Sequence, residues 1–167
     1  MHKALRNYKH VTLVGHSLGA LLTVAYAAKH TTQVRAIALI GMPYFGTEEA
    51  AYRHLRSGGV KWGLVYTNVI LATITCILTR RVFGWLLPRI LTDMPRAVAE
   101  DLVKHTWRSS TSSLWEVVYR YDAAPDLRSL DESLPVLMIH GREDDVAPFT
   151  AIQKTRGGAA QLVPRGT

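Results

Sequence analysis

Three short apolar runs, each closed by a glycine, dominate the pattern of hydrophobic and polar positions along the chain. They are His10–Gly15, Val34–Gly41 and Pro135–Gly141, and all are rich in valine, isoleucine or leucine. Strands of a parallel sheet that is covered on both faces have this continuous apolar character. The pattern therefore predicts an α/β fold built on about three parallel strands.

A helix is predicted between the first two runs. Apolar residues recur at helical spacing from Leu18 to His30, and two threonines follow before the second run begins. A strand, a helix and a strand in so short a segment form a right-handed parallel unit by the usual rule. The nine residues before His10 look like the tail of a preceding helix.

The stretch from 43 to 134 interrupts the strand pattern and is typical of several helices. A connection of this length exceeds an ordinary loop, so we expect a helical lid over a sheet core that residues 1–42 and 135–167 form. A polar turn at Ser109–Ser113 is expected to cap a helix that starts near Leu114. The segments with helical spacing are Arg80–Ile90, Ala97–Lys104 and Ser113–Tyr121.

One apolar stretch in this region raises the question of a membrane. Gly63–Leu78 has no charged residue, but its 16 residues fall short of the roughly 20 that a membrane-spanning helix needs. We therefore expect a buried or lipid-facing amphipathic helix. Arg80 and Arg81 follow it directly, and could seat the lid at an anionic bilayer or form an ordinary solvated face.

The pentapeptide Gly15-His16-Ser17-Leu18-Gly19 lies between the first predicted strand and the helix. A serine on a sharp strand-to-helix turn is lifted clear of the sheet, and small residues are expected two positions before and after it. The amide of Leu18, at the start of the helix, would help to hold a developing oxyanion. A plain glycine-rich turn with Ser17 as a helix cap is the alternative, and His16 is assigned no catalytic role.

At these residues the chain resembles the α/β-hydrolase family, in its lid-bearing esterase and lipase-like branch. The resemblance rests on residues 10–20, 34–41 and 135–148, and it implies a partial α/β-hydrolase fold with a parallel sheet core and a helical lid. In this family the triad acid follows the strand after the lid. Matching the glycine and the proline of His140–Pro148 places the acid at Asp144, with Asp145 as the alternative.

The resemblance also implies a histidine about 25 residues beyond the acid, and none follows Asp144 in this sequence. Without that general base Ser17 is an unactivated hydroxyl. Three interpretations stay open: a serine hydrolase of ester or related acyl substrates whose histidine is absent here, a truncated inactive fragment or lid-mediated lipid or protein binder, and an acyltransferase. The family's early strands, with the second oxyanion amide, are absent as well.

Composition and charge limit the classes of partner that we expect the chain to bind. The net charge is +7, but no platform or recognition helix for nucleic acid is apparent, and the expected substrate is a small apolar ester or acyl compound. No metal or cofactor motif occurs, and Cys76 is the single cysteine. We expect a cytoplasmic protein, with peripheral membrane contact through the lid left open. The tail Leu162–Gly166 resembles a thrombin-cleavable linker and is left out of the expected site.

Overall fold

The structure is a computed structural model of the 167-residue chain, and it divides into two compact units. The sheet unit comprises Met1–Ala51 and Glu116–Thr167, and the helical unit comprises Tyr52–Trp115. The described residues are 1–57, 63–86, 106–141, 144 and 147, isolated positions between 89 and 104, and the backbone of 160–163.

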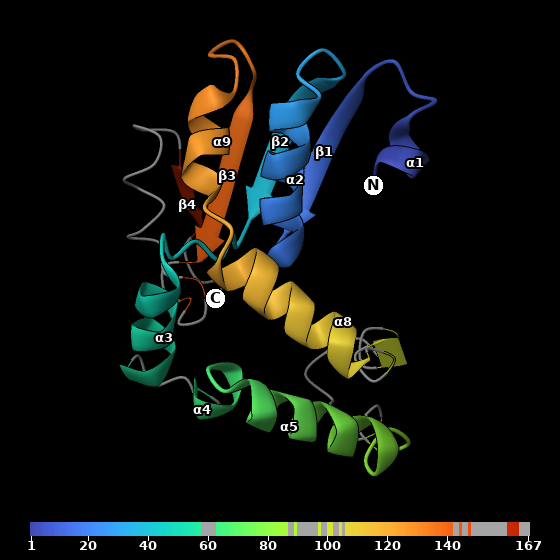
Figure 1. Ribbon diagram of the computed structural model, residues 1–167. Helices are drawn as coiled ribbons and strands as arrows, with labels where there is room; N and C mark the ends of the chain where they lie inside the picture. Colours follow the sequence, from blue (N-terminus) through green and yellow to red (C-terminus); the bar gives the residue numbers. More distant parts are fainter. Residues whose placement is uncertain are drawn as a thin grey trace. The chain divides into compact units, whose positions relative to one another are not determined.

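The sheet unit is built on parallel strands. They follow the order β1 (Val11–His16), β2 (Val34–Ile40), β3 (Val136–Gly141) and β4 (Ala160–Val163) (Figure 1). The register places Gly15 beside Leu39, and Leu39 beside Met138. The predicted α/β architecture with a parallel sheet is confirmed, and each of the three predicted strands is present within one residue of its expected ends.

The fourth strand is a correction. The sequence predicts about three strands, with the linker-like tail excluded from the expected site and residues 135–167 assigned to the sheet core. Leu162 and Val163 lie in β4, where they pair with His140 and Gly141 of β3. The tail therefore contributes to a fourth strand of the sheet core, which the sequence did not predict.

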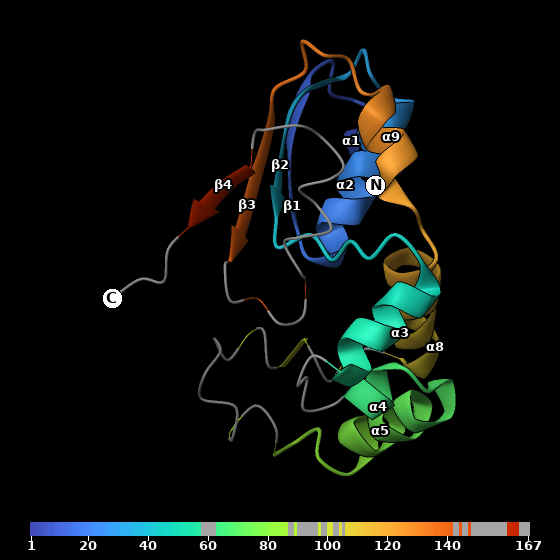
Figure 2. The ribbon, with the colours of Figure 1, turned by 90° about the vertical axis from the view of Figure 1, so that its left-hand side faces the viewer.

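Two helices cover one side of β1, β2 and β3, as Figure 2 shows: α2 (Leu18–Lys29) and α9 (Ala123–Ser129). The short α1 (His2–Leu5) precedes β1, as the sequence indicated. The sheet unit's core lies beneath α2 and α9, and its most deeply buried side chains include Leu21, Val24, Ile37, Leu39, Met42 and Leu127. α9 belongs to this unit, and it falls within the residues 43–134 for which the sequence predicts a lid.

The other face of the sheet is more exposed than predicted. Along β1, Leu13 and Gly15 are buried whereas Thr12, Val14 and His16 are exposed, which is the alternation of a strand covered on one face. Val14 is 68% exposed, and Leu137 on β3 is 39% exposed. The expectation of strands covered on both faces is therefore wrong for β1 in this chain.

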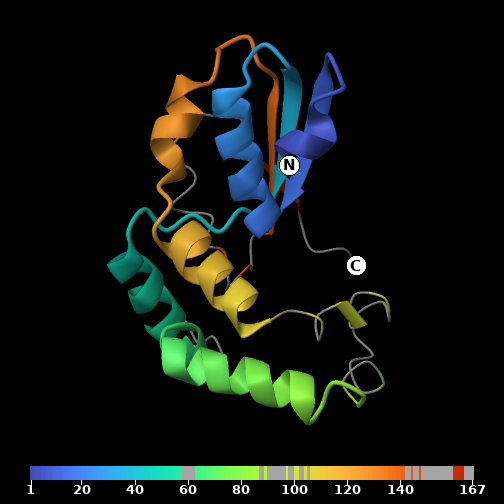
Figure 3. The same ribbon diagram turned by 45° about the vertical axis from the view of Figure 1, so that its right-hand side comes forward.

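The helical unit contains α4 (Gly63–Tyr66), α5 (Val69–Arg81) and α8 (Trp107–Ser112), which Figure 3 shows with α5 beside α8. The apolar run 63–78 is therefore two helices, because the Asn68 side chain caps α5 by accepting hydrogen bonds from the amides of Ile70 and Leu71 at 3.0 and 3.2 Å. No residue of α5 is buried, so the buried alternative is wrong. Among the described residues, no helix has the length and apolar character to cross a bilayer.

The predicted polar turn at Ser109–Ser113 is helical. Thr106 caps α8 by accepting a hydrogen bond from the Ser109 amide at 3.1 Å, and α8 continues into the π-helix Ser113–Tyr119. Of the amphipathic segment expected over 80–90, Arg80 and Arg81 are the last residues of α5, Arg89 is helical, and residues 87, 88 and 90 lie outside the described residues. Half of the expected helix 97–104 lies outside the described residues, and Ala97, Glu100 and Asp101 are helical.

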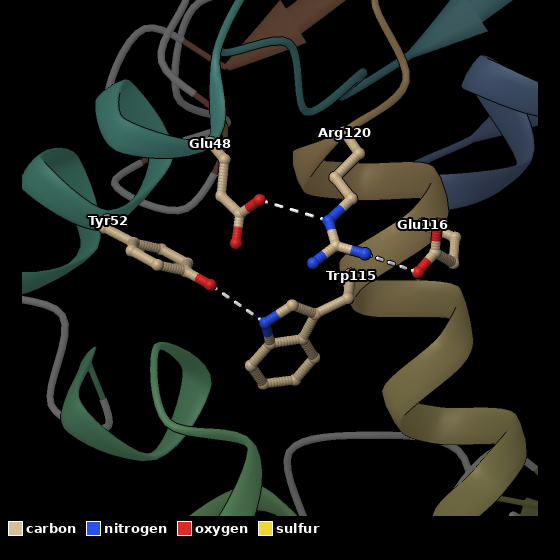
Figure 4. A network of polar contacts seen from close by, with 5 residues as sticks. All are labelled: Glu48, Tyr52, Trp115, Glu116 and Arg120. Atoms are coloured by element: carbon tan, nitrogen blue, oxygen red, sulfur yellow. Dashed lines mark hydrogen bonds and ion pairs between the residues drawn. The ribbon is translucent and has the colours of Figure 1, made fainter.

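The chain crosses from one unit to the other twice, once within α3 (Glu48–Ser57) and once within the π-helix. Within each unit, side chains of α3 bond to side chains in or directly after the π-helix (Figure 4). In the sheet unit, the Arg120 guanidinium donates to Glu48 at 3.1 Å and to Glu116 at 2.7 Å. In the helical unit, the Trp115 indole N–H donates to the Tyr52 hydroxyl at 2.8 Å.

Candidate active site

Ser17 occupies a strained turn between β1 and α2. Its φ of 53° and ψ of −125° make it the sole described non-glycine residue with positive φ. Such a backbone costs on the order of 1–3 kcal/mol and persists where the surroundings fix it. Here the Ser17 amide donates to the Ile40 carbonyl at 2.9 Å, and the Ser17 carbonyl accepts from the Ala20 amide at 2.9 Å. The Ser17 residue is exposed, as a nucleophile must be.

The two glycines of the pentapeptide differ in their surroundings. A Cβ at Gly15 would lie 2.5 Å from both the Gly19 carbonyl oxygen and the Thr23 hydroxyl, too close for any side chain. The expected need for a small residue therefore has a steric cause at Gly15. A Cβ at Gly19 would meet nothing within 4 Å, so the same reason does not apply there.

The amide of Leu18 is the first of α2. Amides in the first turn of a helix have no acceptor within the helix, and the helix dipole favours negative charge beside them. Leu18 directly follows the strained serine, so its N–H is the first amide of the helix after Ser17. This placement agrees with the predicted oxyanion role, which stays a prediction.

Asp144 lies close to the carboxyl end of β2. Its Oδ2 is 3.7 Å from the position that a Cβ at Gly41 would take, and the His16 Nε2 is 3.9 Å from that same position. Gly41 has a φ of 53°, so a side chain there would be strained by the backbone conformation. The structure thus places Asp144 near the end of the strand that adjoins the Ser17 turn. Asp145 lies outside the described residues.

The Asp144 segment is anchored by hydrogen bonds that the sequence reasoning missed. Asp144 Oδ1 accepts from the Ala147 amide at 2.9 Å, which is a turn-stabilising bond of the Asx type. The buried His140 side chain lies on β3, and its Nε2 donates to the Ala147 carbonyl. A histidine at the end of a buried strand, with an acidic loop after it, was the signal that could have identified this anchor.

His16 is the second residue whose position the sequence did not indicate. It was assigned no catalytic role, and the structure brings its imidazole and the Asp144 carboxylate to the same glycine. Its ring is exposed at the end of β1. The His16 Nε2 and the Asp144 Oδ2 are thus both neighbours of the Gly41 position.

Two tyrosines, the buried Tyr44 and the half-buried Tyr121, fix the segments around α9. The Tyr44 hydroxyl donates to Asp122 at 2.9 Å, and Asp122 also accepts from the Ala124 amide at the start of α9. Burial, followed by the hydrogen bond and the negative charge of Asp122, raises the pKa of Tyr44 to about 12. Burial and the hydrogen bond to Asp126 also raise the pKa of Tyr121. These contacts tie the segment after β2 to the helix before β3.

Solved structures with this fold come from several hydrolases. One solved structure comes from a study of carboxylesterases of Nitrososphaera gargenis. The match covers 99% of this chain and 61% of that protein's chain, with 18% identity and a TM-score of 0.58. The chain matches the N-formylmaleamic acid deformylase of Pseudomonas putida at 15% identity and a TM-score of 0.64, covering 96% of this chain and 60% of the deformylase. The enol-lactonase of Burkholderia xenovorans gives 21% identity and a TM-score of 0.56, with coverages of 98% and 60%.

These likenesses concern the fold, and the chain spans about three fifths of the length of these structures. No curated protein sequence matches the chain. The model of the family described as the alpha/beta hydrolase fold, in contrast, matches residues 3–161, which is nearly the whole sequence. With the parallel sheet and the serine turn, this match shows that the chain belongs to the alpha/beta hydrolase fold family.

Proposed function

We propose that these residues carry the nucleophile and the acid of a serine hydrolase for ester or related acyl substrates. The observation that carries the proposal is the strained backbone of Ser17 between β1 and α2. Backbone strain of this kind is retained where it serves a site, and here it exposes a hydroxyl beside the first amide of a helix. A carboxylesterase and an enol-lactonase among the structural neighbours support the same class of substrate.

In the proposed mechanism, Ser17 Oγ attacks the carbonyl carbon and the Leu18 N–H stabilises the oxyanion that forms. Asp144 orients the imidazole that takes the serine proton. No histidine follows Asp144 in the 167 residues, so we propose that these residues alone turn over substrate poorly. Loss of one triad member typically lowers turnover on the order of 10⁴- to 10⁶-fold. We propose the helical unit as the lid, and the serine turn is equally compatible with transfer to an acceptor other than water.

Chemical rescue tests this proposal. The chain alone should hydrolyse p-nitrophenyl butyrate slowly, and millimolar imidazole should raise the Ser17-dependent rate by supplying the missing base. Ser17→Ala should abolish the imidazole-dependent rate, and Asp144→Asn should reduce it. The control is Ser57→Ala, a serine on α3 in the other unit.

Two results would contradict the proposal in different ways. A fast rate without imidazole that Ser17→Ala abolishes would show that the chain already holds its base. His16→Ala would then test His16 as that base, because its Nε2 and the Asp144 Oδ2 both lie within 4 Å of the Cβ position at Gly41. An imidazole-dependent rate that Ser17→Ala leaves unchanged would remove Ser17 from the mechanism.

A further inference from the structure

Helix α5 presents its largest apolar side chains to the outside. Ile70, Ile74, Ile77, Leu78 and Arg81 recur at the spacing of one helix face, and all are exposed. Ile70 is 66% exposed, and Ile74 and Leu78 are each 48% exposed. We call the four apolar residues among them, Ile70, Ile74, Ile77 and Leu78, the α5 stripe.

The opposite face of α5 has the smaller and more polar side chains. Ala72, Thr75, Cys76 and Thr79 line a cavity of about 230 Å³ that residues of α8 also line. A helix packed in a water-soluble domain would normally direct its isoleucines inward and its threonines outward. In α5 this arrangement is reversed, which indicates that the outer face meets an apolar phase.

Positive charge is concentrated in the same unit. Tyr52–Trp115 contains nine lysine and arginine residues against three aspartate and glutamate residues, so it carries +6 of the chain's +7. The sequence has no aspartate or glutamate between Glu49 and Asp93. Arg80 and Arg81 end α5, and with Arg108 of α8 they line a groove of about 590 Å³.

Aromatic side chains complete the pattern of an interfacial surface. Phe83 and Trp85 follow α5 directly, and Trp85 is 67% exposed. Trp107 also lines the groove of the arginines, where the Arg108 guanidinium lies 5.4 Å from the centre of its ring. Tryptophan and arginine side chains beside an apolar face are typical of segments that lie in the headgroup region of a bilayer.

We propose that the helical unit docks on the surface of an anionic lipid bilayer through the α5 stripe. The stripe would enter the boundary between headgroups and acyl chains, while Arg80 and Arg81 contact the lipid phosphates. Charge complementarity selects this partner over a second copy of the chain, because pairing two stripes would bring two units of +6 together. The docking does not depend on the chemistry of Ser17.

Vesicle co-sedimentation of the full chain tests the proposal. Binding should be strong to vesicles of equal parts phosphatidylglycerol and phosphatidylcholine, weak to pure phosphatidylcholine, and weaker in 0.5 M NaCl. The variant Arg80→Gln/Arg81→Gln should bind about 30-fold more weakly, from about 1 kcal/mol for each cation near the surface. Its matched control is Arg6→Gln/Lys9→Gln, which removes the same charge from exposed positions of the sheet unit.

A second variant tests the apolar contact. Ile70→Gln/Ile74→Gln/Ile77→Gln should lose about 100-fold or more in vesicle affinity, with an unchanged circular dichroism spectrum because none of the three side chains is buried. Leu22→Gln, an exposed apolar residue on α2, is the control and should bind as the wild type does. Ser17→Ala should also bind normally, which separates this test from that of the hydrolase.

The proposal is overturned if neutral and anionic vesicles bind equally, or if the arginine variant binds like its control. It is equally overturned if the wild type binds no vesicles. Light scattering of the wild type and of the triple isoleucine variant then shows whether a second copy of the chain covers the α5 stripe. A wild-type dimer that the variant converts to a monomer shows that a second copy binds there. A monomer for both proteins shows that neither lipid nor a second copy covers the stripe.

Discussion

The two regions with the clearest apolar patterns, β2 in the sheet unit and α5 in the helical unit, use those patterns in opposite ways. Ile37 and Leu39 of β2 are 2% and 1% exposed and form part of the core. Ile70, Ile74 and Ile77 of α5 are as apolar, yet all are exposed. Apolar periodicity therefore identifies the element and its face, whereas what lies against that face is decided elsewhere in the fold.

Among the substitutions that compare buried with exposed positions, replacing Gly15 should lower the free energy of unfolding the most. It disturbs the backbone beneath the serine turn. Gly15→Val would drive a side chain into the Gly19 carbonyl and the Thr23 hydroxyl, and we expect a loss of about 4 kcal/mol or more in the free energy of unfolding. Gly19→Ala, where a Cβ meets nothing, should change it by less than about 1 kcal/mol. Urea unfolding measures both, and equal losses would contradict the steric explanation.

The same substitution in both regions compares them most directly. Ile37→Ala should lower the free energy of unfolding by about 2–5 kcal/mol, because it opens a cavity in the core. Ile74→Ala should change it by less than about 0.5 kcal/mol, since that side chain is 48% exposed. Thermal and urea unfolding of the two variants measure these losses. A loss of stability at Ile74 as large as the loss at Ile37 would contradict the contrast between the two regions.

The break between α4 and α5 gives a smaller prediction. Asn68→Ala removes the side chain that caps α5, and we expect a loss of about 1 kcal/mol in the stability of the helical unit. Asn68→Asp retains an accepting oxygen and is the matched control. Hydrogen exchange of the α5 amides should accelerate in the alanine variant alone, and protected amides there would show that packing rather than the cap starts the helix.

The raised pKa of Tyr44 predicts a dependence on alkaline pH. The folded chain holds the phenol proton up to about 12, whereas the unfolded chain releases it near its ordinary 10, so this contribution to stability is complete below pH 10 and declines as the pH rises toward 12. Tyr44→Phe should cost about 1 kcal/mol at pH 8 for the lost hydrogen bond. The difference from the wild type should shrink above pH 10.

Guanidinium unfolding at pH 8 and at successive steps above pH 10 measures that difference. Tyr8→Phe, on an exposed ring, is the control and should leave stability unchanged at pH 8. A difference between wild type and Tyr44→Phe that stays constant up to pH 12 would contradict a raised pKa for this phenol.

Much of the sheet unit could be predicted because its elements are locally encoded. Continuous apolar runs identified β1, β2 and β3, and the glycine-serine pentapeptide located the turn at Ser17. The short α9 was missed because its seven residues include a proline and give little periodicity, and its cap depends on Asp122, which a distant tyrosine also contacts. β4 was missed because its pairing with β3 is a long-range interaction.

The candidate site divides in the same way. Ser17 and Leu18 follow from a local motif, and Asp144 follows from the family resemblance, matched at a glycine and a proline around it. The position of both His16 and Asp144 around Gly41 depends on how the ends of β1 and β2 meet, which no single segment encodes. The His140 anchor likewise depends on a contact between a strand and the segment that follows it.

The most direct test of the central claim is to locate covalent labelling of the chain by a fluorophosphonate, using tandem mass spectrometry. In the presence of imidazole we expect the phosphonyl group on Ser17, and we expect little labelling when imidazole is left out. The serines of α8, Ser109 and Ser110, serve as internal controls and should stay unmodified. Labelling spread over several serines, or found on a residue other than Ser17, would contradict the account.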